Sequence, residues 1–157
     1  MNLKRPHKAN RTMDQNRTFK YFTLAEFLKS RKASELGIDN TPSFEVVEHL
    51  ATLTGQILDP LRAAYGKPIT VTSGYRSPAL NKAVKGVANS AHLRGDAADL
   101  QAKDMAGFKA FVVRWLKSSG ARFDQCILER SGKDEWVHIG IYSSTGSQRG
   151  EIKSMNV

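Results

Sequence analysis

The chain of 157 residues has few cysteines and no long apolar run, so neither disulfides nor a membrane anchor is expected to stabilise it. Its single cysteine, Cys126, excludes an internal disulfide and a site built from several thiolates. No run of about 18 apolar residues is present, which argues against a membrane-spanning helix. The polar, charged N-terminus has no apolar segment typical of a secretory signal peptide. We therefore expect one domain that folds around one hydrophobic core.

Acidic residues are also scarce, with 15 Asp and Glu against 24 Lys and Arg, a net charge of +9. Residues 1–20 hold six Lys or Arg and one acidic residue, a net charge of +5, so the other 137 residues carry only +4. Such a segment attracts nucleic acid, anionic lipid or an anionic cell wall, and composition does not choose among them. We expect residues 1–18 to form a basic, flexible tail and residues 19–157 to form the domain.

The hydrophobic pattern beyond residue 19 predicts an α+β fold. Ser43 begins a long helix, which Pro60 is expected to disturb and Gly66 to end. Further helices are predicted at 78–84 and 105–119, strands at 69–72, 96–102, 125–129 and 136–141, an edge strand after residue 142, and a loop at 34–44. Together these elements predict a small antiparallel sheet with helices packed on it.

Two of the four histidines, His92 and His138, are candidates for a metal site. Asp99 follows His92 by seven residues, beyond Gly95, which permits a sharp reversal of the backbone. A loop that carries His92 can therefore fold back beside a strand that carries Asp99. Two histidines and one carboxylate are a common catalytic zinc set, which leaves a position for water or substrate.

Such a site also needs a carboxylate that accepts a proton, and Asp134 and Glu135 are the candidates. Strand alternation favours Asp134, because residues 134, 136 and 138 share a face while Glu135 points the other way. Glu135 can serve only if a bulge or turn redirects its side chain. The residues alone leave both candidates open.

Three motifs occur in order along the chain: S-G-Y-R-S-P at 73–78, S-x-H-x-x-G-x-A-x-D at 90–99 and E-W-V-H at 135–138. In this order they resemble the zinc D-Ala-D-Ala carboxypeptidase family of peptidoglycan peptidases. That family includes the vancomycin-resistance carboxypeptidases and dipeptidases and some phage endolysins. The resemblance covers about residues 20–142 and implies a hedgehog-type zinc peptidase fold that binds one zinc ion.

The resemblance also implies a role for individual side chains. The zinc ligands it implies are His92, Asp99 and His138. Glu135 takes the role of catalytic base, which requires an irregular start of the strand at Trp136. Arg76 holds the substrate and polarises the scissile carbonyl, and Ser90 hydrogen-bonds the terminal carboxylate or the peptide of the substrate.

By this resemblance the chain is expected to be a zinc metallopeptidase that cleaves peptidoglycan peptides, as a carboxypeptidase or as a stem or cross-bridge endopeptidase. The alternative is a non-catalytic, zinc-containing module that binds cell-wall peptide, against which the presence of Glu135 argues. Anionic cell wall becomes the expected partner of the basic tail, and nucleic acid is disfavoured. We expect a monomer that acts at the cell wall or in the periplasm. The lack of a recognisable signal peptide suits a phage-encoded lysis enzyme released from the host cytoplasm.

Overall fold

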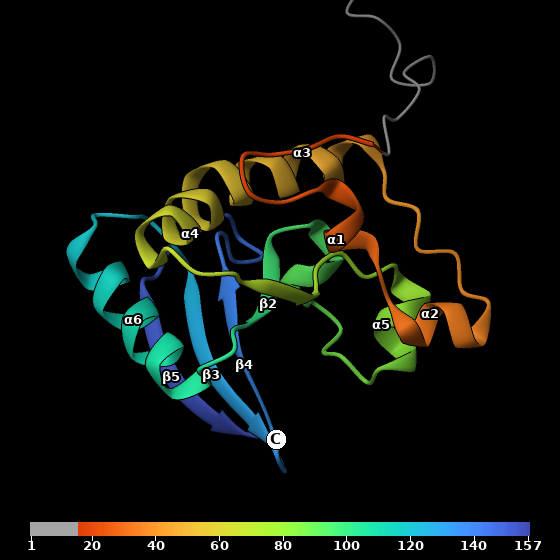
Figure 1. Cartoon of the computed structure of the whole chain (residues 1–157). Coiled ribbons are helices and arrows are strands. Elements are labelled where there is room, and N and C mark those ends of the chain that lie inside the picture. The colour runs from red at the N-terminus through yellow and green to blue at the C-terminus, as the bar shows by residue number, and fades with distance from the viewer. Residues whose placement is uncertain (1–15) are drawn as a thin grey trace, which may run out of the picture.

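A computed structural model of the chain describes residues 16–157 (Figure 1). Most of the predicted tail, residues 1–15, lies outside the described part. Arg17 and Thr18, which the predicted boundary assigns to the tail, already contact the domain. Arg17 Nη1 lies 3.0 Å from Glu48 Oε1, and Thr18 forms an isolated β-bridge with Thr23. Two residues of the predicted tail thus contact the domain, and the boundary at residue 19 stays a prediction.

The described chain folds as the expected single α+β domain. The helical elements are α1 (Leu24–Leu28), α2 (Arg31–Leu36), α3 (Phe44–Leu53), the π-helical turn η2 (Thr54–Leu58), α4 (Asp59–Tyr65), α5 (Pro78–Ala83), the 3-10 helix η3 (Ala91–Arg94) and α6 (Met105–Ser118). The strands are β1 (Thr70–Ser73), β2 (Ala97–Gln101), β3 (Gln125–Ser131), β4 (Asp134–Gly140) and β5 (Glu151–Asn156). Within residues 16–157, no helix is both long and apolar enough to cross a membrane.

The helix α2 replaces the first part of the loop predicted at 34–44. Ser30 begins it by accepting the N–H of Ala33 at 3.1 Å, and Gly37 ends it with a φ of 64°. The predicted disturbance at Pro60 is confirmed. Proline has no N–H to donate to the carbonyl four residues earlier, and the helix widens into η2 just before it.

The five strands form one sheet in the order β1-β2-β4-β3-β5. The pairs β1–β2, β2–β4 and β3–β4 are antiparallel as expected, but β5 is parallel to β3. The chain that leaves β4 is tied to the start of β3, where Gly150 N donates to Phe123 O and Glu151 N donates to Asp124 O. Because β5 begins beside the beginning of β3, it runs in the same direction.

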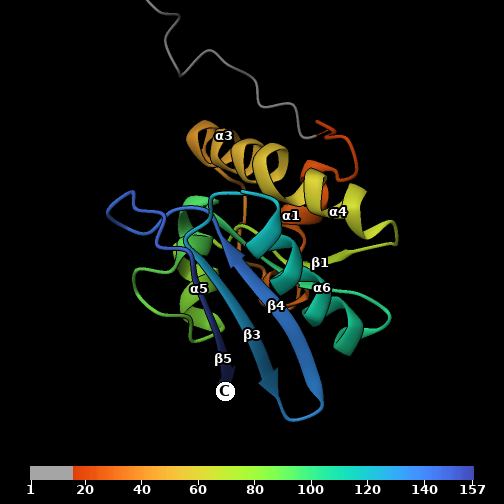
Figure 2. The same cartoon turned by 90° about the vertical axis from the view of Figure 1, so that its left-hand side faces the viewer.

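Side-chain alternation gives the sheet two different faces. One face is apolar and packs against helices, as Figure 2 shows with α6 beside the sheet and α3 and α4 above it. Its buried residues include Ala98, Leu100, Cys126, Val137 and Ile139, which share one core with residues of α3, α4 and α6. We call the other face the polar face; it carries Asp99, Gln125, Glu129, Trp136 and His138.

Candidate metal centre

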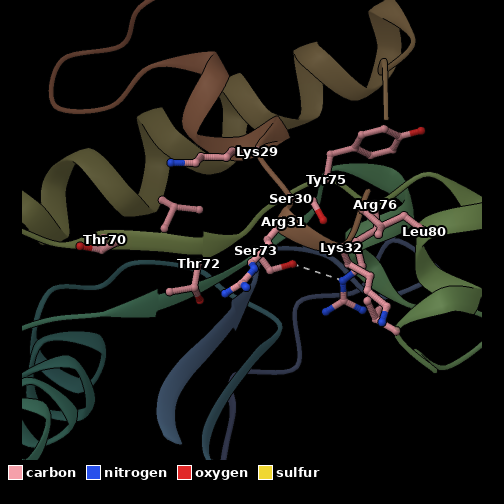
Figure 3. Close-up of a pocket in the computed structure, with 12 residues that line it drawn as sticks. Lys29, Ser30, Arg31, Lys32, Thr70, Thr72, Ser73, Tyr75, Arg76 and Leu80 are labelled. Atoms are coloured by element: carbon pink, nitrogen blue, oxygen red, sulfur yellow. Dashed lines mark hydrogen bonds between the residues drawn. The ribbon is translucent and has the colours of Figure 1, made fainter. Parts of the chain in front are cut away.

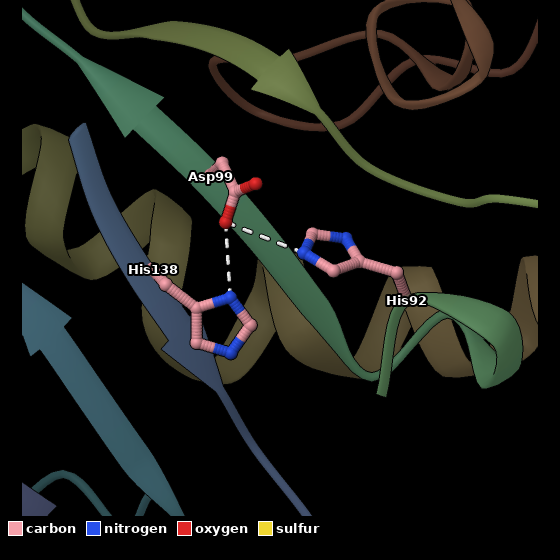
Figure 4. Close-up of side chains that lie close together, drawn as sticks. All are labelled: His92, Asp99 and His138. Carbon is pink, nitrogen blue, oxygen red and sulfur yellow. Dashed lines mark hydrogen bonds and ion pairs between the residues drawn. The ribbon is translucent and has the colours of Figure 1, made fainter. Parts of the chain in front are cut away.

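The structure brings together the three predicted metal ligands, His92, Asp99 and His138 (Figure 4). The register of β2 against β4 pairs Asp99 with His138. Asp99 Oδ1 lies 2.9 Å from His138 Nδ1 and 3.3 Å from His92 Nε2. One ligand atom from each of the three residues lies within 4.8 Å of the other two. We call these residues the His-Asp-His cluster.

The short helix η3 delivers His92 to this cluster. Ser90 accepts the backbone N–H of His92 at 3.2 Å and so begins the helix. Gly95 then reverses the chain into β2 with a φ of 76°, and a Cβ atom there would lie only 2.7 Å from Val46 O. The predicted reversal at Gly95 is therefore confirmed. For Ser90, which is buried, the structure gives this capping contact, and its contact with substrate stays a prediction.

The orientation of the His92 ring fits a metal ligand. Its Nδ1 lies 2.7 Å from Gly74 O, which can only accept, so Nδ1 carries the proton. With that proton on Nδ1, Nε2 is the ring atom whose lone pair can bind a metal, and it is buried without a hydrogen-bond partner among the described residues. This lone pair faces Asp99 Oδ1. Two electron-rich atoms held so close in a buried place fit a cation between them, and the donor set suits zinc.

The charge state of Asp99 agrees with this fit. Burial acts to raise the pKa of Asp99, but the neighbouring His92 and His138 outweigh burial and hold that pKa well below its usual range. The carboxyl group is therefore ionised, as a metal ligand must be.

Arg76 places a guanidinium beside the cluster. Its Nη2 lies 3.6 Å from Asp99 Oδ2, while Nε donates to Ser73 Oγ at 3.2 Å and Nη1 donates to Asn81 Oδ1 at 3.1 Å. Burial lowers the pKa of Arg76 from its usual value, and the charges of Asp99 and Glu129 act against that change. The three contacts fix Arg76 beside the cluster, and its contact with substrate stays a prediction.

Glu135, the predicted catalytic base, does not reach the cluster. The β3–β4 ladder runs without interruption through Ser131↔Asp134, Arg130↔Glu135 and Glu129↔Trp136. The irregular strand start expected at Trp136 is therefore wrong, and alternation directs Glu135 to the face opposite His138. Its Oε1 accepts hydrogen bonds from Lys109 Nζ at 2.9 Å and Arg130 Nη2 at 2.8 Å. These bonds lower the pKa of Glu135 to about 2, which makes it a poor proton acceptor.

On the polar face the hairpin carries two carboxylates, Asp134 and Glu129, and Glu129 lies nearer to His138 along the ladder. It pairs with Trp136 in the ladder, and its Oε2 accepts the Nε1–H of Trp136 at 2.5 Å. The signal was present in the sequence, because a tight turn after Ser131 fixes which residues of the two strands lie opposite each other. The predicted candidates for the base, Asp134 and Glu135, lie on the second strand of the hairpin, whereas Glu129 lies on the first.

The family model described as Peptidase M15 matches residues 20–140. The chain belongs to this family. The resemblance to zinc D-Ala-D-Ala carboxypeptidases, drawn from the three motifs, is thereby confirmed at the level of the family. M15 proteins are metallopeptidases, so this chain is a peptidase by family. No curated protein matches the chain.

The matched residues of this M15 peptidase include the whole His-Asp-His cluster and Arg76, Glu129 and Trp136. The match ends at the last residue of β4. The parallel edge strand β5 therefore lies outside the part of the chain that the family shares.

Proposed function

We propose that this M15 peptidase uses one zinc ion, held by His92, Asp99 and His138, to hydrolyse a peptide bond of bacterial peptidoglycan. The observation that carries the proposal is the buried Nε2 of His92, which has no hydrogen-bond partner among residues 16–157 and faces Asp99 Oδ1 within a set of two imidazoles and one carboxylate. That arrangement is costly to bury unless a cation completes it.

His92, Asp99 and His138 would hold a zinc ion that would act as a Lewis acid, acidifying a water molecule and polarising the scissile carbonyl. Glu129 accepts the proton of the attacking water and passes it to the amine that leaves when the C–N bond breaks. The hydrogen bond from Trp136 orients the Glu129 carboxylate for this transfer. Arg76 donates to the carbonyl oxygen as negative charge develops on it. The products are a new carboxylate and a new amino group.

The test is digestion of purified peptidoglycan, with release of amino groups as the readout and mass spectrometry of the muropeptides to identify the bond. We expect release that stops with a chelator and returns when zinc is added. Loss of a terminal D-Ala identifies a carboxypeptidase, and separation of cross-linked stems identifies an endopeptidase. If the zinc-loaded protein binds peptidoglycan but releases no amino groups, the non-catalytic binding module is the better description.

We extend the proposal to the basic N-terminal residues, which would attach the enzyme to the anionic cell wall where it acts. Deletion of residues 1–15 should weaken adsorption to purified cell walls, and more so at low salt, because the attraction is electrostatic. Turnover of a small soluble muropeptide should stay unchanged. Adsorption that is equal for the two forms at every salt concentration contradicts this role.

A further inference from the structure

A cavity of about 540 Å³ opens beside Arg76, and no member of the His-Asp-His cluster lines it (Figure 3). One wall is the segment from Lys29 to Lys32, which links α1 to α2 and includes the first two residues of α2, and the opposite wall is β1. Tyr75, Leu80 and Val84 complete the lining together with Arg76. The volume lies in the range of ordinary ligand sites. We call this cavity the β1 pocket.

The β1 pocket is positively charged. Its lining contains Lys29, Arg31, Lys32 and Arg76 and no acidic residue. In Figure 3 the side chain of Arg76 reaches Ser73, to which its Nε donates a hydrogen bond. Arg31 forms an exposed ion pair with Glu35, whereas neither Lys29 nor Lys32 has an ion-pair partner within residues 16–157. Such a lining is complementary to carboxylate groups.

The other wall of the pocket offers backbone hydrogen bonds. β1 stands at one end of the strand order and pairs only with β2 among the described strands. All four of its residues line the pocket, although consecutive side chains of a strand point to opposite faces. The strand therefore meets the pocket along its edge. A free strand edge binds an extended peptide by adding it as a further strand.

Arg76 connects the pocket to the cluster. It lines the β1 pocket and also lies 3.6 Å from Asp99 Oδ2 through Nη2. Ser73, the last residue of β1, pairs with Asp99 in the sheet and accepts from Arg76 Nε. A peptide that follows the edge of β1 toward Ser73 therefore arrives at the cluster.

We propose that the β1 pocket binds an extended, carboxylate-bearing segment of the substrate, which adds to the edge of β1 while Lys29 and Lys32 pair with its carboxylates. This inference rests on the proposed function for the identity of the substrate, a peptidoglycan stem peptide with free carboxylates. The pocket then selects free carboxylates over amidated ones.

The experiment measures the binding of two fluorescein-labelled stem pentapeptides of one sequence, with free or with amidated carboxyl groups. Fluorescence anisotropy on the full chain with Glu129→Gln gives a dissociation constant without turnover. Adding Lys29→Gln and Lys32→Gln should weaken binding of the carboxylate peptide about three- to tenfold, the range for exposed charge pairs, and leave the amidated peptide within about twofold. The control pair Lys103→Gln and Lys117→Gln removes the same charge near α6, outside the pocket, and should change neither constant.

An equal loss for the two peptides, or for the two lysine pairs, overturns the inference, because a general electrostatic field would then explain it. No loss for the carboxylate peptide also overturns it. In that case self-association of the Lys29→Gln/Lys32→Gln variant would indicate that the lysines only protect the edge of β1. Selective binding without hydrolysis by the zinc-loaded parent chain would retain the pocket and reject the proposed function. Hydrolysis at the same rate with and without Lys29→Gln and Lys32→Gln would support the proposed function and reject the role of the pocket.

Discussion

The two faces of the central sheet differ in function: the same strands contribute core residues to one face and residues of the metal centre to the other. On the helix-covered face, β4 contributes Val137 and Ile139, which are fully buried in the core. On the polar face, the alternate residues of the same strand are Trp136 and His138, of which His138 belongs to the His-Asp-His cluster. β4 therefore holds His138 rigidly, because the residues directly before and after it, Val137 and Ile139, are buried in the core.

The same comparison explains the two glutamates of the β3–β4 hairpin. Glu135 lies on the helix-covered face, where Lys109 of α6 and Arg130 neutralise it. Glu129 lies on the polar face beside Trp136. The face of the sheet to which each carboxylate points therefore decides whether it contacts α6 or lies on the side of the metal centre. The predictions below test this division, beginning with the largest effect.

Removal of a ligand from the polar face should abolish the metal site. His138→Ala leaves two of three protein ligands, so we expect bound zinc, measured by mass spectrometry of metals in dialysed protein, and hydrolysis of peptidoglycan to fall to background. The circular dichroism spectrum should stay that of the folded parent. His49→Ala, which removes a half-exposed histidine on α3 outside the cluster, is the matched control and should keep its zinc. Full zinc occupancy in His138→Ala would show that the cluster is not the metal centre.

The two glutamates should respond unequally to the same substitution. Glu129→Gln should lower kcat about 10²- to 10⁴-fold, the usual contribution of a general base, with zinc still bound. Glu135→Gln should lower kcat less than about threefold, because its carboxylate faces α6 and already pairs with Lys109 and Arg130. Steady-state kinetics on one soluble muropeptide compares the two variants directly. The reverse order would return the role of base to Glu135 and require the β3–β4 register to differ in the active enzyme.

The residues of the cluster could be predicted from the sequence, but the strand register that aligns them could be predicted only in part. His92, Asp99 and Gly95 lie within eight residues, so local backbone geometry was enough to predict their approach. His138 and Glu129 depend on which strands pair and where the hairpin turns, and those are long-range properties. The edge strand predicted after residue 142 is β5, but its parallel direction could not be predicted, because that direction depends on contacts near Asp124 formed by the chain after β4.

A cavity on the helix-covered face should affect stability and leave catalysis unchanged. Ile139→Ala removes a fully buried side chain that lies one residue after His138 in β4. We expect the free energy of unfolding to fall by about 2–5 kcal/mol, as for other large-to-small core substitutions. Urea denaturation measures the loss, and kcat per folded molecule should stay within about twofold of the parent. A large drop in kcat without a loss of stability would mean that the two faces are not independent.

The smallest effect concerns the one thiol, Cys126, which lies fully buried on the helix-covered face of β3. Burial raises the pKa of Cys126 to about 12, so the reactive thiolate is nearly absent at about pH 8. We expect no reaction with a thiol reagent such as dithionitrobenzoate in the native protein, and one reactive thiol per chain in denaturant. Ser144→Cys adds a thiol at an exposed position in the segment after β4 and should give one native-state reaction where the parent gives none. Labelling of native Cys126 at the rate of the unfolded chain would instead show that α6 leaves this face of the sheet often enough to admit reagent. The covered face would then be the more mobile of the two.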